Sequence, residues 1–113
     1  MSLKELKKLV TDFRDARDRK QFHNPKDLAT AIAIESAELQ EKFLWKSQKE
    51  SYEIGKNDPE VKEEISDIFN YILLFADACN IDLSKSIKDK IDKNDKKYPV
   101  EKAKGKSEKY NKL

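Results

Sequence analysis

The stretch Leu28–Leu39, LATAIAIESAEL, decides the fold of this 113-residue chain. It is an almost wholly apolar run that two acids, Glu35 and Glu38, interrupt. At about 3.6 residues per turn, residues three or four positions apart share one face of a helix, so both carboxylates are brought toward the apolar side. Because burying a carboxylate is costly unless it is paired or bound to a cation, the stretch predicts a helix that carries a polar site.

A second pair of acids, Glu64 and Asp67, repeats this arrangement on a later segment with an apolar face. The spacings E-x-x-E and E-x-x-D place the members of each pair on one side of their helix. Two such pairs on separate helices can form a carboxylate cage around one cation. A solvated charged face is the ordinary role of helix acids, so a structural acid cluster stays open as the alternative.

Helix-capping signals divide the chain into four long helices and a short one. The dipeptides Asn24-Pro25 and Asp58-Pro59 each combine an N-cap residue with a proline at the first helical position. Ser2 can cap the first helix, and Ser84 starts the last long helix. Ser47 opens a capping-box pattern that predicts the short helix.

We expect these helices to end at polar or proline-containing breaks. Gln21–Asn24 interrupts the first helix, and the second runs to about Trp45. Gly55–Asn57 ends the short helix, Asn80–Leu83 forms a turn, and Tyr98-Pro99 stops the last helix. Because no stretch alternates as a strand does, the predicted fold class is all-α, a four-helix-bundle type.

Size and composition predict one small domain that oligomerisation completes. A single all-α domain over residues 1–98, followed by a polar, Lys-rich tail over residues 99–113, fits a chain of 113 residues. Only 37% of the residues are hydrophobic and 41% are charged, so the core is small. The apolar helix needs cover on more than one side, and we expect a homodimer or a homotetramer.

Charge, cysteine content and hydropathy exclude several classes of partner. The net charge is only +2, which gives no global basic field for nucleic acid; the basic excess is confined to Lys85–Leu113. No apolar run approaches the roughly 20 residues that cross a bilayer, and no secretory signal is visible, so no membrane partner is expected. The lone Cys79 is expected as a buried core thiol in a cytoplasmic protein.

The acids favour a hard divalent cation. Carboxylates offer only oxygen ligands, which suit Mg²⁺ or Mn²⁺. The single histidine, His23, lies at a helix break, and di-iron bundles need histidines on two helices, so iron and zinc are disfavoured. Because Mg²⁺ usually recruits phosphate oxygens, an all-carboxylate site predicts a phosphate-bearing substrate.

Two further features are candidates for contacts with such a substrate. Lys90 and Asn94 lie one turn apart on one helix face, although lysines near a helix C-terminus also serve the helix dipole. Trp45, the only tryptophan, suits base stacking or burial in a core or an interface. No P-loop and no G-x-G-x-x-G motif is present, so those nucleotide-binding folds are unsupported.

The order of these motifs resembles that of a known family. Glu35-Ser-Ala-Glu38 followed by Glu64-Ile-Ser-Asp67 is similar to the E-x-x-E…E-x-x-D signature of the MazG-like, all-α nucleotide pyrophosphohydrolases. The similarity runs from about Leu6 to Tyr110. The stretches that resemble the small dCTP-pyrophosphatase branch are Phe13-Arg-Asp-Ala-Arg-Asp, Gln21-Phe-His-Asn-Pro-Lys-Asp-Leu, Phe43-Leu-Trp-Lys46 and Lys90-Ile-Asp-Lys-Asn94 with Tyr98-Pro-Val.

This resemblance implies an Mg²⁺-dependent enzyme, dimeric or tetrameric, that converts a nucleoside triphosphate to the monophosphate and pyrophosphate. The metal ligands that it implies are Glu35, Glu38, Glu64 and Asp67. The residues that it implies at the nucleotide are Trp45, as a base-stacking ring, Tyr71, Lys90 and Asn94. We expect Glu38, or else Glu35, to orient the attacking water.

The chain departs from that branch at the base. Arg19 stands where the branch usually has a second tryptophan, and Val10 where vertebrate members place a histidine. A guanidinium can stack on a base or meet a phosphate, but it does not reproduce an indole wall. We expect Arg19 at the substrate and a changed base preference, with dCTP or a modified deoxynucleoside triphosphate as the substrate.

Two alternatives stay open at this point. The first is a non-catalytic helical scaffold or regulatory bundle whose acids pair with Arg17, Lys90 or Lys93. The second is an enzyme of the same fold with another substrate, such as dUTP, an oxidised or methylated nucleotide, or a phosphoribosyl-nucleotide.

Overall fold

The computed structural model describes all residues from Met1 to Leu113 and contains only helices and turns. The predicted all-α fold class is therefore confirmed. The chain forms two compact units, Met1–Ile81 and Asp82–Leu113, which are described separately below. The expected division into a domain over residues 1–98 and a tail stays a prediction.

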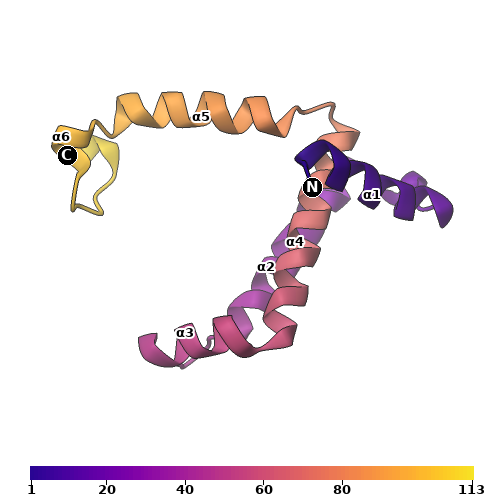
Figure 1. Cartoon of the computed structure of the whole chain (residues 1–113), viewed down its shortest axis with the longest axis horizontal. Helices are drawn as coiled ribbons and strands as arrows, with labels where there is room; N and C mark the ends of the chain where they lie inside the picture. The colour runs from indigo at the N-terminus through magenta and orange to yellow at the C-terminus, as the bar shows by residue number, and fades with distance from the viewer. The chain divides into compact units, whose positions relative to one another are not determined.

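Helix α4 is the element that the other helices of the first unit contact. The elements of this unit are α1 (Leu3–Ala16), the 3₁₀ turn η1 (Lys20–Phe22), α2 (Pro25–Glu41), α3 (Gln48–Asn57) and α4 (Pro59–Ala78). Helices α2 and α4 lie side by side and run antiparallel, with α3 between them in the chain (Figure 1). Helix α1 packs near the C-terminal end of α4, where Lys7 lies 3.9 Å from Asp77.

The predicted starts of four helices are confirmed by their caps. The Ser2 hydroxyl accepts a hydrogen bond from the Glu5 backbone N–H at 3.1 Å, which completes a capping box at α1. Ser47 forms the same motif at α3. The side chains of Asn24 and Asp58 cap α2 and α4, each followed by a proline in the first turn.

Helix α2 ends at Glu41, so the prediction that it runs to Trp45 was wrong. Tight turns follow it: the backbone N–H of Phe43 donates to the Gln40 carbonyl at 3.1 Å, and that of Lys46 to the Phe43 carbonyl at 3.1 Å. Trp45 has a φ of 62°, in the left-handed region that no residue of a right-handed helix adopts. The turn redirects the chain into α3.

The core of the first unit is small, and its buried apolar residues come from α2 and α4. Its buried apolar residues are Leu28, Val61, Leu73, Leu74 and Ala76. Four of these five residues belong to α4, and this helix is apolar on more than one side. On another side of α4, Ile65 and Phe69 are 51% and 37% exposed.

Cys79 is exposed, so the expectation of a buried core thiol was wrong. It is the C-cap residue of α4. Its backbone N–H donates to the Phe75 carbonyl, which closes the last turn. The thiol is left uncovered at this end of the helix.

One charged side chain, Arg14 on α1, is buried with 5% of its surface exposed. Its guanidinium donates to the carboxylate of Asp15 at 2.9 Å and to that of Asp77 on α4 at 2.8 Å. A buried charge is tolerated only when it is paired and hydrogen-bonded. This ion pair therefore fixes where α1 crosses α4.

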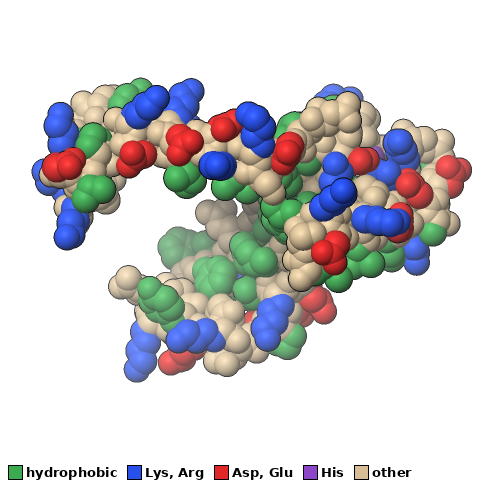
Figure 2. Space-filling view, turned by 45° about the horizontal axis from the view of Figure 1, so that its top comes forward, with side chains coloured by type: hydrophobic (Ala, Val, Ile, Leu, Met, Phe, Trp, Pro, Cys, Tyr) green, Lys and Arg blue, Asp and Glu red, His purple; other side chains and the backbone are tan.

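Many large apolar side chains remain at the surface (Figure 2). Those that are more than half exposed in the first unit include Phe13, Phe22, Ile34, Leu44, Trp45 and Tyr52. None of the helices is both long and apolar enough to traverse a lipid bilayer.

The second unit contains α5 (Leu83–Lys97), α6 (Val100–Ala103) and the 3₁₀ turn η2 (Tyr110–Lys112). Helix α5 begins at Leu83, one residue before the predicted start at Ser84, and Asp82 is its N-cap. The polar tail thus contains two short helical elements, α6 and η2. Its end returns to α5, since the ring of Tyr110 lies edge-on to that of Tyr98 with centroids 6.2 Å apart.

The ion pair between α1 and α4 is open to a stability test. We expect Asp77→Ala to lower the free energy of unfolding by about 1–3 kcal/mol, because Arg14 would lose its charged partner on α4. Urea unfolding followed by circular dichroism measures this loss. Asp12→Ala, which removes only the exposed pair with Lys8, is the matched control and should stay within about 0.5 kcal/mol. Equal losses in the two variants would contradict the role of Arg14.

Candidate metal centre and adjoining cavity

Three of the four predicted acids converge between α2 and α4. Glu35 comes from α2, and Glu64 and Asp67 come from α4 one turn apart. One carboxylate oxygen from each lies within 4.8 Å of the other two. The antiparallel packing of the helices brings the acid face of α2 against that of α4, as the two E-x-x-E/D spacings require.

The three carboxylates are short of partners. One carboxylate oxygen of Glu35 and one of Glu64 are buried without any hydrogen-bond partner. Within the unit Met1–Ile81, the ion pairs involve other acids, such as Asp12, Asp77 and Glu60. The alternative in which Arg17 neutralises the cluster is not observed: this guanidinium lies over the Phe13 ring and donates to the Phe13 carbonyl.

Burial and neighbouring carboxylates raise the pKa of Glu35 from 4.5 to about 7. Burial is the largest cause, followed by the carboxylates of Glu64 and Glu38, to which only a protonated Glu35 could donate, and by the negative charges of Glu38 and Asp67. Desolvation and like charges both disfavour the ionised carboxylate. A proton or a cation must therefore offset the negative charge that collects here.

A divalent cation fits this set of residues. The donors are carboxylate oxygens only, which hard cations such as Mg²⁺ and Mn²⁺ prefer. The buried oxygens without partners on Glu35 and Glu64 are the atoms that a cation would satisfy. Glu35, Glu64 and Asp67 are thus the residues that would hold it.

Glu38 occupies a different place from the other three acids. It lies one turn after Glu35 on α2, is exposed, and is not a member of the group of three close carboxylates. It is near enough to Glu35 to raise the pKa of that side chain. Its predicted roles as metal ligand and as the residue that orients water stay predictions.

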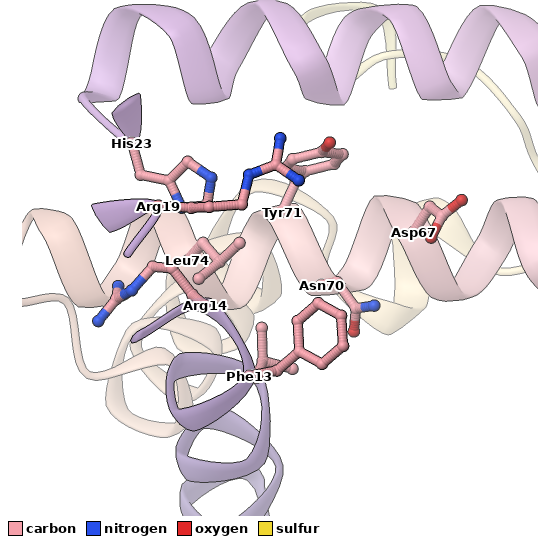
Figure 3. A pocket seen from close by; sticks show the side chains of 9 residues that line it. Phe13, Arg14, Arg19, His23, Asp67, Asn70, Tyr71 and Leu74 are labelled. Atoms are coloured by element: carbon pink, nitrogen blue, oxygen red, sulfur yellow. The ribbon is translucent and has the colours of Figure 1, made fainter. Parts of the chain in front are cut away.

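A cavity of about 180 Å³ adjoins the acids between α1, η1 and α4. Figure 3 shows Arg19 extending between His23 and Tyr71, with Asp67 at one end. Asp67 therefore belongs both to the acid cluster and to the cavity wall. The other lining residues are Val10, Phe13, Arg14, Asn70 and Leu74.

The structure brings two predicted substrate residues, Arg19 and Tyr71, into this cavity. Reasoning from the sequence missed Arg14, His23 and Asn70 as lining residues. Asn70 carried a usable signal, because it lies three positions after Asp67 and so faces the same side of α4. The sequence held no such signal for Arg14 and His23. They line the cavity only because of the way in which α1 and the turn η1 pack against α4.

Trp45 lies beyond the other end of α2 from Arg19. Its side chain is 93% exposed beside an open hollow lined by Gln40 and Leu44. Helix α2 has 17 residues and so is about 25 Å long. Within one chain, Trp45 and Arg19 therefore do not line the same cavity.

Lys90 and Asn94 belong to α5, in the second unit. Lys90 is exposed, and Asn94 is half-buried, with its backbone carbonyl accepting the N–H of Tyr98 at 2.8 Å. Their predicted contacts with phosphate or nucleotide stay predictions.

Comparison with known proteins agrees with this geometry. Residues 30–113, which include both acid pairs, match the model of the MazG-like family. The chain belongs to the MazG-like family. The family resemblance predicted from the motifs is thereby confirmed.

Named members of the family are similar over almost the whole chain. The dCTP pyrophosphatase 1 proteins of human and rat are each 35% identical to it over 115 aligned positions, which cover 99% of this chain and 68% of the relative. The crystal structure of a pyrophosphatase from Archaeoglobus fulgidus is 41% identical and superposes with a TM-score of 0.79. That match covers 85% of this MazG-like chain and 91% of the other.

The raised pKa of Glu35 predicts that its charge destabilises the metal-free protein. This penalty is full above a pH of about 7, falls as the pH drops, and is absent below the ordinary pKa of 4.5. At pH 8 in EDTA we expect Glu35→Gln to raise the melting temperature by a few degrees. We also expect it to remove the gain that Mg²⁺ confers on the unmodified protein.

Scanning calorimetry with and without Mg²⁺ measures both effects. Glu63→Gln removes a neighbouring exposed acid of α4 and is the matched control, which should keep the gain from Mg²⁺. A melting temperature in EDTA that falls in Glu35→Gln would contradict the account of like-charge crowding.

Proposed function

We propose that this chain hydrolyses a nucleoside triphosphate to the nucleoside monophosphate and pyrophosphate. The observation that carries the proposal is the group of Glu35, Glu64 and Asp67, with two buried carboxylate oxygens that lack partners, at the edge of a cavity. The family membership and the names of the relatives support the same activity. dCTP and modified deoxynucleotides are the starting candidates for the substrate.

In this reaction water adds to the α-phosphorus and the bond from that phosphorus to the oxygen bridging to the β-phosphate breaks. Pyrophosphate leaves with the bridging oxygen, and the proton of the attacking water is released. Mg²⁺ held by Glu35, Glu64 and Asp67 would neutralise charge on the phosphate oxygens. Glu38, exposed and one turn from Glu35, orients the water and accepts its proton.

The cavity beside Asp67 takes the nucleoside. Its wall combines apolar surface from Val10 and Leu74 with the ring of Tyr71. A mostly apolar hollow with a few polar groups is typical of a site for a flat heterocycle. Because Asp67 is common to both places, a nucleotide whose phosphates lie at the acids can place its base in the cavity.

The working form is a homodimer or a homotetramer. Ile34 on α2 and Ile65 on α4 are 54% and 51% exposed, and a second copy of the chain would cover such apolar surface. Trp45 and Arg19 of one chain do not line the same cavity. In an oligomer, Trp45 of one copy can instead stack on a base in the cavity of another copy. We also infer a cytoplasmic location, which a single unpaired cysteine favours.

Product analysis tests the proposed reaction. With a nucleoside triphosphate and Mg²⁺ we expect pyrophosphate and no inorganic phosphate among the initial products. Glu64→Gln should lower kcat/KM by about a hundredfold or more, because it removes a ligand from a cation that stabilises several kcal/mol of developing charge. Glu63→Gln, the adjacent exposed acid, should stay near the unmodified rate. Release of single phosphates, or an unimpaired Glu64→Gln, would refute the assignment.

Mixing two defective variants tests whether Trp45 acts in another copy. We expect Trp45→Ala to raise KM more than it lowers kcat, since stacking on a base holds in both ground and transition states. When Trp45→Ala and Glu64→Gln chains are co-expressed, a mixed oligomer regains one complete site. Its kcat/KM should exceed the average of the two parents. Strict averaging, or an active monomer by light scattering, would show that Trp45 does not act between copies.

A further inference from the structure

A lysine borders the acid cluster at the end away from the cavity. Lys42 lies seven positions after Glu35 and four after Glu38. It is the C-cap residue of α2, and its backbone is still helical, with φ −61° and ψ −24°. The side chain of Lys42 therefore lies on the helix face that carries the two acids, one turn beyond Glu38.

An ion pair directs the ammonium of Lys42 across to α4. Its Nζ donates to a carboxylate oxygen of Glu60, in the first turn of α4. Glu60 is four residues before Glu64, so about 6 Å of helix separates this ion pair from the acid cluster. The side chain of Lys42 is 26% exposed, against 65% for Glu60. The ammonium is thus oriented beside the cluster and still reaches solvent.

Lys42 keeps hydrogen-bond donors for a ligand. An ammonium carries three N–H donors, and Glu60 is the acceptor that the structure gives to one of them. The close carboxylates of Glu35, Glu64 and Asp67 are not its partners. Phosphate oxygens that extend from a cation at these acids toward Glu60 would find the remaining donors within a helical turn.

The order of groups along α4 decides which part of a nucleotide lies there. The cavity meets the cluster at Asp67, and its wall continues along the helix to Tyr71. Lys42 contacts α4 at Glu60, which lies on the opposite side of Glu64 along the helix axis. With the nucleoside in the mostly apolar cavity and its α-phosphate at the acids, the other two phosphates point away from the cavity and toward Lys42.

We propose that Lys42 binds the pyrophosphate part of a nucleoside triphosphate through the N–H donors that Glu60 does not use. The inference rests on the proposed function and adds a substrate-binding residue to it. In the reaction, the leaving pyrophosphate gains negative charge as its bond to the α-phosphorus breaks. A fixed ammonium at this place offsets that charge, and it transfers no proton.

A purely structural role of the ion pair predicts a different pattern. Lys42→Met and Glu60→Gln each remove the same link between α2 and α4, so a structural pair would give both variants the same defect. A lysine that binds phosphate separates them, because Glu60→Gln keeps the ammonium and removes a competing carboxylate. Both variants should fold, since a partly exposed ion pair contributes little to stability. Circular dichroism checks this.

The experiment titrates the full-length chain with pyrophosphate in the presence of Mg²⁺ and measures binding by calorimetry. We expect Lys42→Met to weaken pyrophosphate binding by about tenfold, as for one lost hydrogen bond to a charged group. Glu60→Gln should bind pyrophosphate at least as tightly as the unmodified chain. dCMP, which lacks the pyrophosphate part, should bind all variants equally. Lys49→Met, which removes an exposed lysine of α3, is the matched control and should change neither affinity.

Equal weakening of pyrophosphate binding in Lys42→Met and Glu60→Gln would overturn the inference, because it would make the pair structural. Unchanged binding in Lys42→Met would also overturn it, because the phosphates would then lie elsewhere. The proposed function fails separately: if pyrophosphate binds through Lys42 but no nucleoside triphosphate is hydrolysed, the binding role of the lysine stands without the reaction.

Discussion

The structure depends on the antiparallel packing of α2 against α4. This contact buries Leu28 and Leu73 almost completely and, a few turns away, presses three carboxylates together. Hydrophobic burial therefore supplies the free energy that holds like charges at short range. A chain with a larger core would tolerate such a cluster easily. Here only five apolar residues are buried. The free energy of their burial must stabilise the fold and also offset the repulsion within the acid cluster.

The small size of the core also explains how α1 packs on α4. Helix α1 is held to α4 by the buried Arg14 and its bond to Asp77 in addition to apolar contact, so an ion pair takes part of the role that side-chain packing has in larger domains. The crossing of α1 also makes the cavity, because the helix leaves space between itself, η1 and α4. The position of this cavity thus follows from how the N-terminal helix packs on α4.

Local rules of the sequence predict the elements well and their packing less well. The starts at Ser2, Asn24, Ser47 and Asp58 depend on hydrogen bonds within a few residues, and the structure has all of them. The convergence of Glu35 with Glu64 and Asp67 was predictable from spacing, because helix geometry fixes the face of each acid. The burial of Leu73 and the exposure of Cys79 were not, since they depend on which side of α4 a neighbour covers. The cavity needed the crossing of α1, which no local pattern encodes.

The backbone conformation of Trp45 makes the turn after α2 costly for this residue type. A large aromatic residue at a φ of 62° carries a conformational cost of about 1–3 kcal/mol that glycine at the same position would avoid. A chain optimised for folding alone would place glycine or asparagine there. Its indole is also almost entirely exposed to water, so its burial does not stabilise its own unit. Under the role proposed for Trp45 between two copies of the chain, position 45 lowers thermostability in exchange for a contact with the substrate.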